Sequence, residues 1–368
     1  MTKDHQPGTR GSAIVVGASL AGLMSALTLS RIGLRVTMLE RSTRKVRTGA
    51  ALPVSDGLLE RLTGRRPRQG KDVIPSGAQA WADVHAGLSS AAQADPGISL
   101  RSPVRVTDVG QDERSAWVVT DDGEFVRADL VVGADGHASV VRRHAVPEAP
   151  DATFSGYVIW LGLVDECEIR ARPWPSDLAI LYERDYCLNA YYLPGADGSV
   201  AQGKRRIGWG WYDSGRNDLL RARGVVTDDV VQRTLRAADV PDTTFDELAD
   251  EAREIWPNPW REAIVDCISR RAVIGTPIGE YLPHRLVSGR VCLVGDAAHL
   301  SSPMTGSGFD ASAQDALALA DALGGNGDPG SISYALRRYE AARLDAARQL
   351  VHSGQSFNNS FAPRGASQ

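Results

Sequence analysis

Residues 12–40, SAIVVGASLAGLMSALTLSRIGLRVTMLE, decide the fold class of this chain. Residues 12–16 form a short apolar run rich in β-branched side chains, which is typical of a fully buried strand. Apolar residues then recur at near-helical spacing from Leu20 to Ile32, and Gly33 is a helix stop signal. Residues 35–40 have the pattern of a second strand. Strand, tight turn, helix and strand in about 30 residues predict a βαβ unit, whose parallel strands need a crossover.

The turn that opens the helix carries the pattern Gly17-x-Ser19-x-x-Gly22. In the dinucleotide-binding fingerprint, the first glycine makes the tight turn, the second admits the pyrophosphate, and the third lets helix and strand pack closely. Ser19 replaces the middle glycine here, and its hydroxyl can itself reach a phosphate oxygen. Glu40 ends the second strand, where an acidic residue binds ribose hydroxyls. These features predict a nucleotide site; the alternative is a glycine-rich turn that binds nothing.

Two later segments also place a glycine-containing turn after a buried strand. Residues 133–142 (GADGHASVVR) taken alone predict a turn with a helix cap at Ser139. Residues 295–310 (GDAAHLSSPMTGSGFD) precede a helix rich in Ala and Leu. A loop fixed by glycine and proline just before a helix N-terminus stabilises developing negative charge. His299 in this segment, taken alone, is more often a structural histidine than a catalyst.

The middle of the chain predicts a different kind of sheet. From residue 151 to about 274, aromatic residues crowd onto short alternating segments, which indicates an antiparallel sheet with one covered face. We expect one helix to begin at Thr227 and another to run from about Thr244 to Trp256. A buried strand returns at 290–295, and Ser331 is expected to cap a last amphipathic helix.

Composition and charge exclude several classes of protein. The 368 residues are 43% hydrophobic and 23% charged, as in ordinary globular proteins, and the net charge of -4 without a marked basic patch argues against a nucleic-acid or anionic-membrane partner. No apolar run approaches the roughly 18 residues of a membrane span, and the N-terminus has no apolar signal-peptide core. The four cysteines stand far apart, so neither a zinc site nor a disulfide scaffold is expected. We expect a cytoplasmic protein without a bound metal.

Together, the three turn motifs resemble the FAD-dependent aromatic hydroxylases of the para-hydroxybenzoate hydroxylase type. The resemblance covers residues 12 to about 350, and the block at 295–310 is its most specific part. Within that family the chain is most similar to the 2,6-dihydroxypyridine hydroxylase group, on residues 17–19 (GAS), 156–160 (GYVIW) and 209–212 (WGWY).

The resemblance implies an α/β fold in two domains. A Rossmann-like FAD-binding domain of three layers (two of strands and one of helices, ββα) would comprise residues 11–150 and 275–330. An inserted antiparallel-sheet substrate domain would comprise residues 151–274, and a C-terminal helix residues 331–356. Residues 1–10 and 357–368 would be flexible tails.

The resemblance also implies which residues bind FAD. The first turn would hold the pyrophosphate, Glu40 the adenosine ribose, and Asp296 the ribityl hydroxyls. Asp135 would serve both FAD and the pyridine nucleotide. The loops at 47–53 and 303–308 would lie beside the isoalloxazine ring, where helix dipole and backbone N–H groups suit an anionic reduced flavin. The full expected set is Gly17, Ser19, Leu20, Ala21, Gly22, Glu40, Arg41, Arg47, Gly49, Ala50, Ala51, Leu52, Asp135, Asp296, Pro303, Gly306, Ser307, Gly308 and Phe309.

For catalysis and substrate binding the sequence gives fewer signals. Arg47, His299 and Pro303 are the expected catalytic residues, and a base could also come from His85, His284 or a tyrosine. Four aromatic residues of the sheet domain are expected to line a pocket for a flat ligand, with sheet core as the alternative: Tyr157, Tyr191, Trp209 and Trp211.

The implied reaction is that of a monooxygenase. NADH or NADPH would reduce FAD, the reduced flavin would react with O2 to a C4a-hydroperoxide, and one oxygen atom would pass to a small aromatic, heteroaromatic or polycyclic substrate. The resemblance implies that the nicotinamide donor binds only transiently, which fits the absence of a second fingerprint from the sequence. Baeyer–Villiger oxidation or epoxidation of a secondary metabolite, a flavin oxidase or dehydrogenase, and a non-catalytic flavoprotein stay open. The choice between a monomer and a homodimer also stays open.

Three departures from the family pattern bear on the site. Asp310 stands where most relatives have asparagine, and residues 80–85 (AWADVH) lack the arginine that often passes the FAD. Only 18 residues separate Leu62 from Trp81, where relatives usually insert a strand pair. One pocket wall is therefore expected to be short, which would suit a larger substrate.

Overall fold

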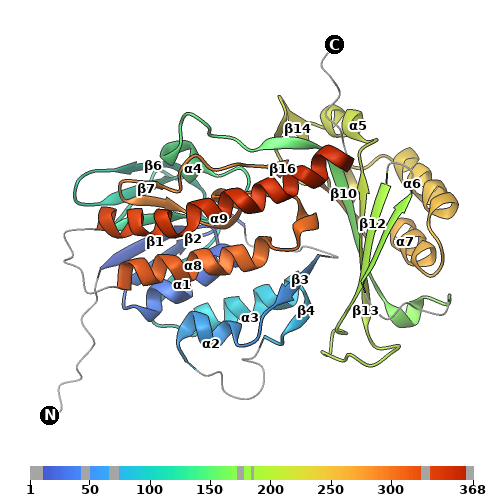
Figure 1. The fold of residues 1–368 in the computed structure, drawn as a ribbon, viewed down its shortest axis with the longest axis horizontal. Coiled ribbons are helices and arrows are strands. Elements are labelled where there is room, and N and C mark those ends of the chain that lie inside the picture. The colour runs from blue at the N-terminus through green and yellow to red at the C-terminus, as the bar shows by residue number, and fades with distance from the viewer. Residues whose placement is uncertain are drawn as a thin grey trace.

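The computed structural model describes residues 11–42, 50–65, 74–171, 178–183, 186–324 and 332–361. Two large sheets divide it into two parts that lie side by side (Figure 1). The six-stranded sheet carries the N-terminal turn, and the seven-stranded sheet is formed from the middle of the chain. The fold is therefore the α/β architecture with an inserted antiparallel sheet that the sequence predicts.

The six-stranded sheet has the strand order β17-β18-β9-β1-β2-β5, and its pairs are parallel except β17 with β18. Its central strands are buried on both faces, which explains their continuous apolar sequences. The bounds are β1 (Ser12–Val16), β2 (Arg35–Leu39), β5 (Ile98–Arg101), β9 (Leu130–Gly133), β17 (Val287–Ser288) and β18 (Val291–Leu293).

Two further layers cover this sheet (Figure 1). On one face, α1 (Leu20–Arg31) packs against α8 (Gly308–Gly324), and the Thr28 hydroxyl donates to the Ala316 carbonyl at 3.0 Å. Beside them lie α2 (Leu58–Thr63), α3 (Trp81–Gln93) and α9 (Ile332–Phe361). The other layer comprises α4 (Val140–Ala145) and a small sheet of β6 (Val106–Gln111), β7 (Ala116–Thr120) and β8 (Phe125–Ala128). A separate hairpin pairs β3 (Ala51–Val54) with β4 (Gly77–Ala80).

The seven-stranded sheet is antiparallel, and α6 (Asp242–Ile255) and α7 (Trp260–Ser269) pack on one of its faces. Its side chains alternate between that helix-covered face and a second face turned toward the first domain. The helix α5 (Asn217–Ala222) follows β13 in the chain. The bounds are β10 (Thr153–Asp165), β11 (Ala179–Glu183), β12 (Tyr186–Leu193), β13 (Arg206–Asp213), β14 (Val226–Thr227), β15 (Val230–Val231) and β16 (Val273–Glu280).

Two expectations from the sequence are wrong. The helix expected from Thr227 is the β14–β15 hairpin, because Asp228 and Asp229 adopt left-handed φ values of 49° and 56° and form a tight two-residue turn. The C-terminal helix does not end at residue 356, because α9 continues to Phe361 and its last residues pack against the seven-stranded sheet. No helix in the described ranges has both the length and the apolar character to cross a membrane.

Candidate functional site

Three turns meet at the carboxyl edge of the six-stranded sheet. The Ala134 amide donates to the Val16 carbonyl at 2.9 Å, and the Val294 amide donates to the Gly133 carbonyl at 2.9 Å. The turns that follow β1, β9 and β18 are therefore immediate neighbours. Open α/β sheets bind their ligands in the crevice at this edge. The structure thus brings together the three motifs that the sequence analysis assigns to one site.

The first turn needs its glycines because backbone groups approach closely. Gly17 has a φ of 98°, and a Cβ there would lie 2.5 Å from the Ala134 carbonyl oxygen. A Cβ on Gly22 would lie 2.0 Å from the Gly17 carbonyl oxygen. Helix α1 begins at Leu20, and Ser19 at its N-cap makes no side-chain capping hydrogen bond. The first amides of α1 and the Ser19 hydroxyl are therefore suited to bind an anion.

Glu40 lies directly beside this turn. Its carboxylate is 8% exposed and accepts a hydrogen bond from the Ala18 amide at 2.7 Å. This bond fixes the turn against the end of β2, and a ribose role for Glu40 stays a prediction. Arg41 is exposed next to it, whereas Arg47 and Gly49 lie outside the described residues.

The β3 strand connects this region to the seven-stranded sheet. Ala51 and Leu52 stand on β3, and the Tyr191 hydroxyl on β12 hydrogen-bonds to the Ala51 backbone. The Ala50 carbonyl accepts a hydrogen bond from the Trp81 amide at 3.0 Å, which anchors β3 at the start of α3. Tyr191 is thereby placed at the contact between the two domains.

The carboxylate of Asp135 in the second turn is used within the protein. It accepts hydrogen bonds from the Ser139 hydroxyl and from the Val140 and Val141 amides, the latter two at 2.7 and 3.3 Å. Burial raises the pKa of Asp135, and these hydrogen bonds oppose that shift in part. Asp135 therefore binds the first amides of α4, whose N-cap is Ser139 as the sequence predicts, and a direct contact of Asp135 with FAD or a pyridine nucleotide stays a prediction.

The third turn is built around a buried ion network. Asp315 on α8 has no exposed surface; His299 Nε2 lies 2.7 Å from it, Arg343 Nε donates to it at 2.8 Å, and the Gly295 amide donates at 3.0 Å. A Cβ on Gly295 would lie 2.6 Å from the Cβ of Ala21. The hydrogen bond to Asp315 therefore holds the third turn on α8, and the close packing at Gly295 brings it into contact with the start of α1.

These contacts favour a structural role for His299 over the expected catalytic one. The ring is 2% exposed and faces Asp315. Burial lowers the pKa of His299, but the charge and hydrogen bond of Asp315 outweigh it and the pKa lies above its usual value. Burial likewise raises the pKa of Asp315, but His299 and Arg343 hold it below its usual range. The pair is thus held as an internal ion pair.

The loop that follows is open. Asp296 is exposed, and no hydrogen bond of its carboxylate to another described residue is found. Pro303, Gly306 and Ser307 are exposed, and a Cβ on Gly306 or Gly308 would meet no atom within 4 Å. The loop ends at the N-terminus of α8, where Phe309 is buried as an anchor. A flat ring can therefore approach this backbone closely.

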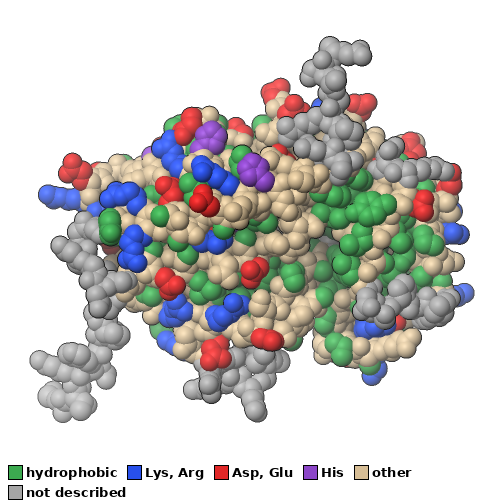
Figure 2. Space-filling model, in the orientation of Figure 1, with side chains coloured by type: hydrophobic (Ala, Val, Ile, Leu, Met, Phe, Trp, Pro, Cys, Tyr) green, Lys and Arg blue, Asp and Glu red, His purple; other side chains and the backbone are tan. Residues whose placement is uncertain are grey.

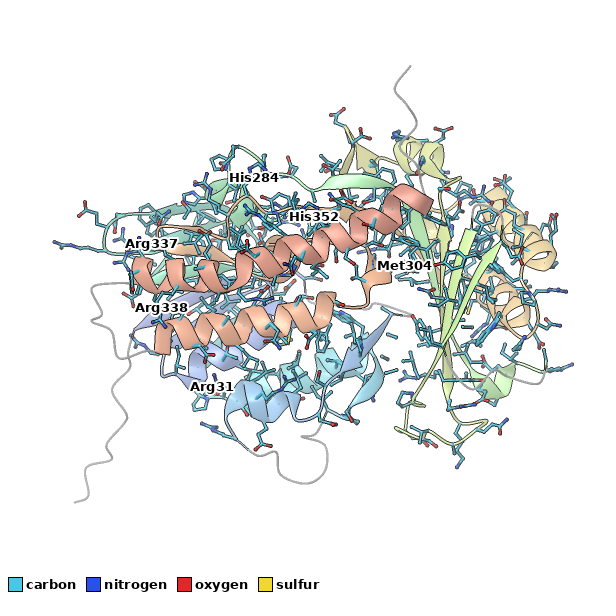
Figure 3. All side chains as sticks on the ribbon, viewed as in Figure 1. Arg31, His284, Met304, Arg337, Arg338 and His352 are labelled. Atoms are coloured by element: carbon cyan, nitrogen blue, oxygen red, sulfur yellow. The ribbon has the colours of Figure 1, made fainter. Side chains whose placement is uncertain are left out.

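The face of the seven-stranded sheet that turns toward this loop is aromatic and polar. The Tyr157 hydroxyl lies 2.8 Å from Ser302 Oγ, and the Asn189 amide lies 3.0 Å from the sulfur of Met304. Met304 lies in the space between α8 and the sheet (Figure 3). Tyr212 belongs to the same cluster as Tyr157, with ring centroids 5.9 Å apart. Tyr157 and Tyr191 therefore belong to the sheet face that is turned toward the loop, and a contact of either with substrate stays a prediction.

Trp209 and Trp211 lie on the opposite face of the sheet, away from the loop. Both are fully buried in the core between the sheet and α6 and α7, where Trp211 packs edge-on against Trp256 at 5.8 Å. Side chains alternate along β13, so these tryptophans share one face and Tyr212 takes the other. Alternation along β13 is therefore the sequence signal that predicts Tyr212, and not the two tryptophans, on the face turned toward the loop. Asn189 and Met304 carried no such signal, because only the domain contact places them at the site.

The remaining histidine candidates lie at different places. His85 Nε2 lies 3.0 Å from the Ala18 carbonyl, and its ring stacks on Trp81 at 4.8 Å, so it supports the first turn. His284 is exposed beside α9 (Figure 3), away from Met304. Within the described ranges, no group of three or more His, Cys, Asp or Glu side chains could hold a metal ion.

Comparisons with known proteins agree with this geometry. A family model described as FAD binding domain matches residues 10–68 and 227–353, and a model described as FAD binding domain-like matches residues 154–270. The chain is 23% identical to 3-hydroxybenzoate 6-hydroxylase of Klebsiella oxytoca, across 96% of this chain and 89% of that protein. It is 25% identical to 2,6-dihydroxypyridine 3-monooxygenase of Paenarthrobacter nicotinovorans, across 92% and 88%.

Solved structures are similar over nearly the whole chain. The structure of 2,6-dihydroxypyridine-3-hydroxylase from Arthrobacter nicotinovorans has a TM-score of 0.78 at 20% identity, covering 98% of this chain and 94% of that one. Klebsiella pneumoniae HpxO, crystallised with FAD and uric acid, has a TM-score of 0.67 at 21% identity, covering 96% and 89%.

Proposed function

This chain belongs to the FAD binding domain family and is a flavin-dependent monooxygenase, and from that premise we propose that it hydroxylates an aromatic or heteroaromatic small molecule with electrons from NADH or NADPH. The observation that carries the proposal is the meeting of three ligand-binding turns opposite an aromatic sheet face. The hydroxylases among its relatives support the reaction class.

The residues of the site fit FAD. The close approach at Gly17 and Gly22 leaves no room for a Cβ, as expected where a helix N-terminus must face a pyrophosphate. The exposed Asp296 carboxylate is suited to accept hydrogen bonds from sugar or ribityl hydroxyls. The open backbone at 303–308 is suited to a flat ring, as its two uncrowded glycines indicate.

We therefore assign the cofactor contacts as follows. The first turn would hold the pyrophosphate, Glu40 the adenosine ribose, Asp296 the ribityl chain, and the loop from Pro303 to Gly308 the isoalloxazine ring. When bound, FAD supplies the electron transfer and the activation of O2. The positive end of the α8 dipole lies at this loop and would stabilise negative charge on the ring.

The sheet face would orient the substrate and exclude water. Burial raises the pKa of Tyr157, Tyr191 and Tyr212, so all three stay neutral near pH 7. Tyr191 is only partly buried, and its hydroxyl would hydrogen-bond a ring substituent. Tyr157 is fully buried and bonded to Ser302 and Asn358, so it would hold the loop against the sheet. The surrounding apolar and aromatic side chains suit a flat ligand. Exclusion of water would matter for a hydroxylase, because water that reaches the reacting groups promotes side reactions without oxygen transfer.

One side of this face is open, which supports a substrate larger than a single ring. Ile180 and Tyr182 on the edge strand β11 are 45% and 60% exposed. They pair with Asn189 and Cys187 on β12 and therefore stand on the same face as the site. Figure 2 shows hydrophobic side chains gathered over the strands of this sheet.

The experiment is an oxygen-transfer assay on the purified protein. We expect a visible flavin spectrum, and NADH or NADPH oxidation that aromatic probes such as 3-hydroxybenzoate, 2,6-dihydroxypyridine and a hydroxynaphthoate accelerate. Product formed under 18O2 should carry one labelled oxygen atom. A flavin that reduces O2 only to H2O2 with every probe would indicate an oxidase instead.

A further inference from the structure

The last two turns of α9 lie directly against the loop that runs from Ser302 to Gly308. Figure 1 shows α9 extending past the six-stranded sheet to reach the seven-stranded one. Gly354 stands inside this helix, where glycine is normally unfavourable. A Cβ on Gly354 would lie 2.8 Å from the backbone nitrogen of Ser302, the residue before Pro303. The absent side chain thus permits contact between the helix and the loop backbone.

A chain of hydrogen bonds extends this contact through buried polar groups. The Tyr157 hydroxyl donates to Asn358 Oδ1 at 2.9 Å and also lies 2.8 Å from Ser302 Oγ. The Asn358 amide donates to Glu280 Oε2 at 2.9 Å, and the Gln355 amide donates to Glu280 Oε1 at 2.7 Å.

The burial of these groups makes their geometry specific. Tyr157 and Ser302 have no exposed surface, and Asn358 and Glu280 are 5% and 6% exposed. Buried polar groups must keep their hydrogen-bond partners, because water cannot replace them. Asn358 accepts on one side and donates on the other, so it joins α9 to β10, to β16 and, through Tyr157, to the loop.

Two phenylalanines of the same turns complete an aromatic cluster on the site face. Phe361 lies 5.4 Å from Tyr157 and 6.0 Å from Tyr212 between ring centroids, both edge-on. Phe357 lies 5.8 Å from Tyr212. These contacts hold the tyrosines that face the loop.

We propose that the face of α9 that carries Gly354, Phe357, Asn358 and Phe361 is a positioning element for the substrate site, with Gly354 and Asn358 as its positioning residues. They fix Ser302 and Tyr157, and through them the loop from Pro303 to Gly308, at the distance from the sheet that the ring substrate requires. The catalytic part of this inference rests on the proposed function.

The first test replaces Gly354 by alanine, with Ser356→Ala as the matched control on the same helix. The new Cβ lies about 0.6 Å inside the 3.4 Å limit of ordinary contact with Ser302, whereas Ser356 is exposed and donates to the His352 carbonyl of its own helix. We expect Gly354→Ala to speed hydrogen–deuterium exchange in peptides covering residues 300–308 and to lower kcat/KM roughly 10–100-fold, with FAD still bound. Ser356→Ala should leave both the exchange in these peptides and kcat/KM at their wild-type values. Equal exchange in the two variants would overturn the proposal.

The second test uses Asn358→Asp and Asn358→Leu. The aspartate keeps an acceptor for Tyr157 but can donate to Glu280 only when protonated. Loop protection in Asn358→Asp should therefore be near wild type at low pH and fall as pH rises, a dependence that a purely packing role would not create. Asn358→Leu should lose protection at every pH. If both variants match wild type across pH, the inference fails. Exchange does not require turnover, so absence of oxygen transfer would overturn the proposed function alone.

Discussion

Replacing Asp315 by alanine should both destabilise the protein and weaken the cofactor site. The buried carboxylate accepts from Arg343 and Gly295 and faces His299. Removing one partner of a buried ion pair costs about 3–5 kcal/mol, because the remaining charges lose their compensation. With an unfolding entropy of about 2.1 cal/mol/K per residue over 368 residues, this corresponds to a fall in Tm of about 4–6 °C.

The matched control is Asp321→Ala on the same helix. The Asp321 side chain is 79% exposed and lies 3.9 Å from Arg31, and exposed pairs of this kind contribute about 0–1 kcal/mol. Thermal unfolding followed by circular dichroism should therefore show a Tm within about 1 °C of wild type. FAD content, read from the visible spectrum of each purified variant, should fall only in Asp315→Ala, because the Gly295 turn loses its acceptor.

Equal melting temperatures for the two variants would refute this reasoning. That result would mean that the buried network contributes no more than a surface pair. A fall in Tm of the expected size together with full FAD content would support the role of Asp315 in stability. It would contradict the proposed link from Asp315 to the cofactor turn.

The remaining predictions concern the turns and the histidine. Gly22→Ala should abolish FAD binding, because its Cβ would lie 2.0 Å from a carbonyl oxygen; an FAD titration that gives wild-type affinity would contradict this. Asp296→Ala should lower FAD occupancy with little change in Tm, since the side chain is exposed. The pKa of His299 is raised by folding, so its stabilisation is complete below about pH 6.5 and is lost as pH rises through the folded pKa. His299→Gln should therefore flatten the decline of Tm above about pH 6.5, and an unchanged decline would count against the ion pair.

Much of the FAD-binding part could be predicted from the sequence. A buried parallel strand and the glycines after it are local features, because close backbone approach excludes every larger residue. The turn at Gly17 and the strands beside it are accordingly found where the sequence predicts them. The substrate side was predicted less well. Residue type alone leaves Trp209 and Trp211 open between the pocket and the sheet core, and strand alternation places both in the core.

The sequence by itself determined the βαβ start, the three turns and the existence of an aromatic sheet, since each depends on neighbours within a few residues. Only the tertiary structure decided that Asp315 neutralises His299, that Tyr212 and Asn189 face the loop, and that α9 reaches Tyr157 through Asn358. These contacts join residues far apart in the chain. Their partners are chosen by how the two domains and the last helix pack, and no local pattern encodes that choice.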